Sequence, residues 1–219
     1  MTSPNTAAVP KEYFPRIRLD LFPGLRVQVS GGLRTSAGKA ALYGIEFYTT
    51  GLILQWRRIV ETADQTFREM EEAAHVPTPD HRPPFIKEIE GSRRRDLVEL
   101  DLHFFLICWD KLDKCWSLLN HEEANLEITK IYAPIKTALY SAARARDYLE
   151  HLDRRYKKSG LSGGGHAMGS DGSLSFIYQD VSNKDKTYDR QIDLGKAQVE
   201  KMREAYKSAL RLLGATIPP

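Results

Sequence analysis

The stretch Ser36–Ala74, SAGKAALYGIEFYTTGLILQWRRIVETADQTFREMEEAA, decides the fold of this chain. Its apolar residues recur at three- and four-residue steps, which place side chains on one face of an α-helix. These residues are Leu42, Ile45, Tyr48, Leu52, Trp56, Ile59, Ala63, Phe67 and Met70. A long helix with one apolar face has to pack against other helices, so the stretch predicts a helical bundle. Gly44 and Gly51 weaken the helix and indicate close packing or a kink.

Three more stretches predict helices that pack on the first. The second is expected from Ser92, its N-cap, to about Asn120, the third from about Glu123 to Lys157, and the last from about Lys196 to Leu213. Pro134 predicts a kink in the third helix. Prolines make Val76–Glu90 an extended connection. The predicted buried face of the second helix consists of Leu97, Leu100, Phe104, Ile107, Leu112, Cys115, Trp116 and Leu119.

Two shorter segments alternate apolar and polar residues around turn signals and predict β-hairpins, over residues 13–30 and 173–193. Residues 1–12 are expected to form a loose tail, and the Gly- and Ser-rich segment Gly160–Gly172 a mobile connection. The predicted fold class is mainly α. We expect one domain over residues 13–219, an up-and-down bundle of four principal helices with two small hairpins.

Composition and charge place the chain among soluble globular proteins. It has 219 residues, 42% hydrophobic and 28% charged, and a net charge of +3. The longest nearly uncharged apolar stretch, Tyr43–Trp56, is too short to span a bilayer, and Met1–Pro10 lacks the features of a signal peptide. Cys108 and Cys115 lie seven residues apart on one predicted helix, roughly 10 Å, which is too far for a disulfide. We therefore expect reduced thiols, a cytoplasmic protein and no membrane partner.

The most informative residue for function is Arg146 of the third predicted helix. Ile128, Ile135 and Ala142 belong to the apolar stripe of this helix, and Arg146 falls inside the same stripe, four residues after Ala142. Because desolvating an unpaired cation is costly, we expect an anionic partner for Arg146. That partner is either an external anion such as a phosphate or an acidic residue of the second helix, Asp101 or Glu99.

Two neighbours of Arg146 add groups that suit phosphate chemistry. His151 lies four residues after Asp147, so the carboxylate can orient the imidazole. Basic residues next to this group would attract an RNA backbone, although a helix C-terminus attracts basic residues for electrostatic reasons alone. The candidate RNA-binding residues are Arg144, Arg154, Arg155, Lys157 and Lys158.

The stretch Arg144–Tyr156, RARDYLEHLDRRY, inside a bundle of long helices resembles the HEPN superfamily (higher eukaryotes and prokaryotes nucleotide-binding). The motif of that superfamily is an Arg, usually followed by a polar residue, with a His four to six residues after the Arg. Arg146-Asp147-x-x-x-His151 matches the tight form. The bundle likeness covers about Ser36–Leu213, and the motif likeness covers six residues.

The resemblance implies an RNA-directed protein. Many members are metal-independent endoribonucleases of toxin–antitoxin or phage-defence systems, and they act as homodimers whose motifs face each other across a cleft. By this likeness His151 is the general acid or base at the ribose 2′-hydroxyl, Arg146 stabilises charge on the phosphate, and Asp147 holds the His tautomer. Other members bind nucleotides or RNA without cleavage, or act as assembly modules.

Helix geometry leaves a second interpretation open. Five residues turn through about 140° along a helix, so Arg146 and His151 diverge unless the helix unwinds or a second chain supplies one of them. The alternative is a non-enzymatic helical scaffold, or a protein-binding partner whose hairpins and Gly-rich segment dock onto another protein. His and Cys show no ligand spacing, so we expect no metal site and no cofactor.

Overall fold

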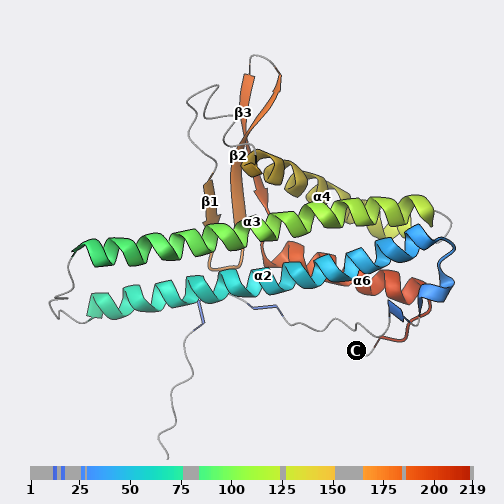
Figure 1. Ribbon diagram of the computed structural model, residues 1–219, viewed down its shortest axis with the longest axis horizontal. Helices are drawn as coiled ribbons and strands as arrows, with labels where there is room; N and C mark the ends of the chain where they lie inside the picture. Colours follow the sequence, from blue (N-terminus) through green and yellow to red (C-terminus); the bar gives the residue numbers. More distant parts are fainter. Residues whose placement is uncertain are drawn as a thin grey trace, which may run out of the picture.

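The computed structural model describes residues 12–13, 16–17, 26–27, 29–75, 84–123, 127–150, 165–183 and 186–217. The fold class predicted from the sequence is confirmed: the protein is mainly helical and carries a small antiparallel sheet (Figure 1). The long helices are α2 (Ser36–His75), α3 (Pro84–Glu122), α4 (Ile128–Glu150) and α6 (Lys196–Leu212), and a short 3-10 helix, η1, spans Ser30–Gly32.

The four helices pack in a ring. Helix α2 contacts α3, α3 contacts α4, α4 contacts α6, and α6 closes the ring against α2. Figure 1 shows α2 and α3 side by side along the whole length of the molecule, with α4 and α6 shorter. The core enclosed by the four helices is rich in large aromatic side chains. Its largest fully buried side chains include Trp56, Trp109, Trp116, Tyr206 and Phe105.

Helix α3 begins earlier than its sequence predicted. Its first residue is Pro84, eight residues before the expected N-cap Ser92, so the part of the expected connection from Pro84 to Glu90 is helical, and residues 76–83 lie outside the described residues. A proline is well tolerated at the first helical position, because it has no N–H that would lack a partner there and its φ already suits a helix. Pro84 therefore starts the helix instead of excluding it.

The buried face predicted for α3 is also partly wrong. Leu97, Leu100 and Phe104, predicted to be buried, are exposed, whereas Leu112, Trp116 and Leu119 are buried as predicted. The predicted face had merged two stripes that lie on different sides of the helix. Phe67, predicted to be buried on α2, is likewise exposed.

Two glycines of α2 let α3 approach closely. A methyl group on Gly44 would lie 2.4 Å from the Cys115 Sγ atom, and one on Gly51 would lie 2.8 Å from the Cys108 Sγ atom. The sequence prediction of close packing at both glycines is therefore confirmed. The ion pair between Arg58 Nη2 and Asp101 Oδ1, at 3.0 Å, continues the same antiparallel register.

The predicted N-terminal hairpin over residues 13–30 is wrong at its end, and its predicted turn lies outside the described residues. Arg26, Val27 and Val29 are helical and lead into η1. Val29 and Leu33, four residues apart, are both buried, while Val27 is 68% exposed, which is helical and not alternating spacing. The physical reason is tertiary: Arg26 Nη1 lies 3.4 Å from Oε1 of the buried Glu46 in α2, which also accepts a hydrogen bond from the Tyr206 hydroxyl of α6.

A carboxylate from the end of α3 holds the start of α2. Buried Glu123 accepts hydrogen bonds from the backbone N–H groups of Arg34, at 2.9 Å, and Thr35, at 3.3 Å. The Thr35 hydroxyl oxygen accepts the N–H of Gly38 at 2.8 Å. The first N–H groups of a helix have no partner within the helix, so these two side chains cap α2.

The hairpin predicted over residues 173–193 is confirmed. Strand β2 (Leu174–Asn183) pairs antiparallel with β3 (Lys186–Asp193), and Leu174 and Phe176 are buried, on a strand that contacts α4. A third strand, β1 (Gly165–Met168), pairs with β2 and lies inside the segment expected to be a mobile connection. Sheet pairing with β2 therefore orders part of that Gly-rich segment. The far half of the β2–β3 hairpin extends beyond the helices (Figure 1).

None of the helices in the described part of the chain combines the length and the low charge needed to cross a bilayer.

We expect Gly44→Ala to destabilise the protein by about 1–3 kcal/mol, because the added methyl group overlaps the Cys115 sulfur and this outweighs the better helix propensity of alanine. The measurement is urea unfolding followed by circular dichroism. The double variant Gly44→Ala/Cys115→Ala removes the overlap and should recover most of the loss. A Gly44→Ala variant as stable as the parent would contradict the close packing of α2 and α3.

The thiols of α3 should react slowly in the folded protein. Burial raises the pKa of Cys108 to about 11 and also raises the pKa of Cys115, and both thiols are free. At pH 8 the thiolate fraction of Cys108 is then on the order of a hundredfold below that of an ordinary thiol. We expect slow reaction with Ellman's reagent in the folded state and fast reaction of both thiols in guanidinium chloride. A fast reaction of both thiols without denaturant would refute their burial.

Candidate functional site

Helix α4 places Arg146 at the edge of the core. Ile135, Leu139 and Ala142 are buried on one face of α4, and Arg146 follows on the same face. The Arg146 side chain is 22% exposed, so it is neither a surface cation nor a sealed one. The apolar stripe predicted for this helix is therefore confirmed, and Arg146 lies within it.

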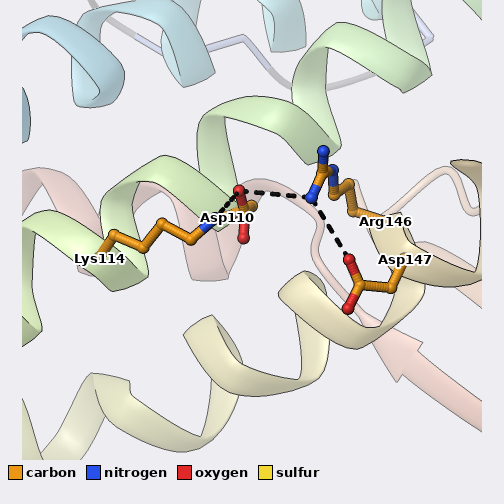
Figure 2. Close-up of polar contacts among 4 residues, drawn as sticks. All are labelled: Asp110, Lys114, Arg146 and Asp147. Carbon is orange, nitrogen blue, oxygen red and sulfur yellow. Dashed lines mark hydrogen bonds and ion pairs between the residues drawn. The ribbon is translucent and has the colours of Figure 1, made fainter.

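Among the described residues, two carboxylates lie beside the guanidinium of Arg146 (Figure 2). Its Nη1 atom lies 3.7 Å from Oδ2 of Asp110, on α3, and 3.3 Å from Oδ1 of the neighbouring Asp147. Asp110 is only 6% exposed in its side chain, and its Oδ2 atom accepts a hydrogen bond from Lys114 Nζ at 2.8 Å. Lys114, Asp110, Arg146 and Asp147 thus form a chain of alternating charges across the contact between α3 and α4.

The expectation that Arg146 has an anionic partner is confirmed, but the partner is neither Asp101 nor Glu99. Asp101 is paired with Arg58 instead, and burial raises the pKa of the Asp101 carboxyl despite that cation. The sequence signal for Asp110 was available. An acid between Trp109 and Leu112 on a buried helix, with a lysine four residues later, is typical of a carboxylate that is partly desolvated and paired.

The other predicted site residues are only partly brought together. Asp147 directs its carboxylate to Arg146, its immediate neighbour, and is 57% exposed. The Arg144 guanidinium carbon lies 6.0 Å from the centre of the Tyr140 ring on the surface of α4. The remaining candidates, His151, Arg154, Arg155, Lys157 and Lys158, lie outside the described residues, so the catalytic role of His151 and the basic patch stay predictions.

The described residues offer no group of three or more His, Cys, Asp or Glu side chains placed to hold a metal ion.

A buried polar contact that the sequence did not reveal joins the N-terminal segment to α2 and α6. Glu46 receives the Tyr206 hydroxyl, and Arg26 lies beside Glu46 and 4.3 Å above the Tyr43 ring. Burial and the neighbouring Glu46 carboxylate raise the pKa of Tyr206 far above its usual range. This phenol therefore keeps its proton, and the contact is structural.

Comparison with known protein families, with curated proteins and with solved structures finds no match to this chain.

What Arg146 can bind depends on the groups that already lie beside its guanidinium. A guanidinium stabilises a phosphate by directing N–H groups at its oxygens, and in this structure a carboxylate of α3 and one of α4 lie beside Nη1. A phosphate oxygen at Nη1 would have to compete with both carboxylates. As it stands, the group is an ion pair that joins two helices.

We expect Asp110→Asn to destabilise the protein by roughly 1–3 kcal/mol, because it removes the buried charge that balances Arg146 and Lys114. Asp147→Asn is the matched control, since the same change at an exposed carboxylate should cost under about 0.5 kcal/mol. Urea unfolding of both variants at pH 7 and low salt measures the difference. Equal losses in the two variants would show that Asp110 does not stabilise the contact between α3 and α4.

Proposed function

We propose that this chain is a non-catalytic helical protein that acts by binding another protein. The observation that carries the proposal is the pairing of Arg146 with Asp110. The cation that drew attention in the sequence has an acidic partner from the neighbouring helix, and that acid is almost fully buried. An Arg engaged in this way has a structural reason to lie in an apolar stripe and needs no external anion to explain it.

The appended sheet supports a binding role. Strand β2 contacts α4 and buries Leu174 and Phe176 in the core, whereas the far half of the β2–β3 hairpin extends past the helices (Figure 1). That far half offers strand edges to a partner.

A HEPN-like, RNA-directed homodimer, with metal-independent ribonuclease activity of a toxin–antitoxin or phage-defence type, is the second candidate. The specific observation in its favour is the length of the Arg146–Asp110 contact. Asp110 lies closer to Lys114, at 2.8 Å, than to Arg146, at 3.7 Å, and the Arg146 side chain keeps 22% of its surface exposed. An RNA phosphate could compete for a guanidinium held at that distance.

Cleavage of labelled single-stranded RNA in EDTA separates the two candidates. We expect no cleavage above buffer by the full chain, and no RNA affinity in fluorescence anisotropy that depends on Arg146. The variants are Arg146→Ala and His151→Ala, and Arg57→Ala on α2 is the matched control, since Arg57 is also of intermediate exposure. EDTA-resistant cleavage that survives in Arg57→Ala and disappears in both site variants would overturn the non-catalytic proposal.

A further inference from the structure

The two longest helices carry large apolar side chains that face away from the core. On α2 these are Tyr43, Phe47 and Leu54. On α3 they are Leu97, Leu100, Phe104 and Leu118. Each of the seven is between 39% and 58% exposed. Isolated exposed leucines are ordinary on a protein surface, so the arrangement of the seven decides whether they matter.

All seven lie on the same side of the α2–α3 pair. Gly51 and Cys108 face each other across the two helices. At about 100° per residue, the seven side chains lie roughly 20–80° to one side of these two positions, and Trp56 and Trp109 of the core lie on the other side. Because the helices are antiparallel, that side is common to both. We call this surface the outer α2–α3 face.

The spacing on the outer α2–α3 face is typical of helix packing. Tyr43, Phe47 and Leu54 follow steps of four and seven residues, and Leu97, Leu100 and Phe104 follow steps of three and four. Such steps form the ridge that a second helix needs. The partner that fits this face is therefore itself helical and apolar.

The exposed area matches what a stable dimer buries. Taking ~200 Å² for each ring, the three half-exposed aromatic side chains offer roughly 300 Å². The four leucines add a similar amount, so the apolar total is roughly 600 Å². A standard interface buries ~800 Å² per partner, of which about 65% is apolar at its core, or ~500 Å².

We infer that the outer α2–α3 face binds the same face of a second copy, about a two-fold axis that crosses α2 near Thr50 and α3 near Ile107. This inference goes beyond the proposed function, because the outer α2–α3 face is distinct from the β2–β3 hairpin and its partner is a second copy of the chain. The axis sets α2 antiparallel to α2 of the second copy, with Phe47 over Leu54 of the partner subunit. It also brings exposed Lys39 close to Glu61 of the partner subunit. Glu61 lies 3.9 Å from Arg16 Nη1 of its own chain and keeps 49% of its side chain exposed, so its carboxylate can accept a second cation.

This dimer differs from one in which two Arg146 groups share a cleft. Asp110, the partner of Arg146, lies roughly 80° further round α3 than Leu100 and Leu118, towards α4. The two Arg146 groups would therefore lie outside the interface. Dimer formation through the outer α2–α3 face needs no nuclease activity.

Light scattering coupled to gel filtration, over concentrations up to about 100 µM, tests the interface. We expect twice the chain mass for the wild type and the single-chain mass for Phe47→Glu and Leu100→Glu, with unchanged circular dichroism. Tyr140→Glu is the matched control, because Tyr140 is 58% exposed on α4, away from this face, and should stay dimeric. A monomeric wild type, or dimers that persist in both glutamate variants, would overturn the inference. The proposed function would still be tested separately by the RNA cleavage assay.

A charge exchange tests the antiparallel register. Lys39→Glu and Glu61→Lys should each weaken dimerisation by about 3–10-fold at low salt. Glu61→Lys also removes the contact with Arg16 of its own chain, so the decisive comparison is the double variant, which should dimerise more tightly than Glu61→Lys alone. Sedimentation velocity gives the dissociation constants. Single variants as tight as the wild type, or a double variant no better than either single one, would overturn the proposed two-fold arrangement.

Discussion

The close approach of α2 and α3 is the constraint on which the rest of the structure depends. Two glycines on α2 face two cysteines on α3. The glycines have no side chain and the cysteine side chains are small, so the two helices can lie close together. The Arg58–Asp101 pair extends the same register towards the far ends of the helices. A two-helix layer of this kind offers a broad apolar side to α4 and α6, and it leaves a second, outer side.

The Arg146 group shows that a cation in an apolar stripe has two possible explanations, an external ligand or an internal ion pair. Desolvation demands a counter-charge, but it does not say whether that charge belongs to a ligand or to the protein. Here Asp110 of α3 supplies it, and the contact ties α4 to the layer made by α2 and α3. The same physics would hold a phosphate, which is why the nuclease interpretation stays a second candidate.

Much of the architecture could be read from periodicity, and the errors have physical causes. Helices α2 and α6 and the 173–193 hairpin were predicted almost to the residue, because their local pattern and their tertiary packing agree. The prediction for the segment around Arg26 was wrong because that segment is held by a contact with the buried Glu46 of α2, which the local alternation of residues does not reveal. The local pattern of α3 marks Asp110 as a partly desolvated, paired carboxylate, but its pairing with Arg146 depends on the packing of α3 against α4, which neither helix sequence reveals alone. The exposed apolar stripe on α3 was predicted to be core because periodicity shows which residues share a helix face, but not whether that face points to the core or to solvent.

The carboxylate of Glu123 makes the beginning of one long helix depend on the end of the other. The N–H groups of Arg34 and Thr35 find their acceptor 89 and 88 residues further along the chain, respectively. Neither terminus can therefore fray alone, since loosening the last turn of α3 also frees the first amides of α2. Amide hydrogens at this end of the bundle should open together, as one cooperative unit, although they lie almost half the chain apart.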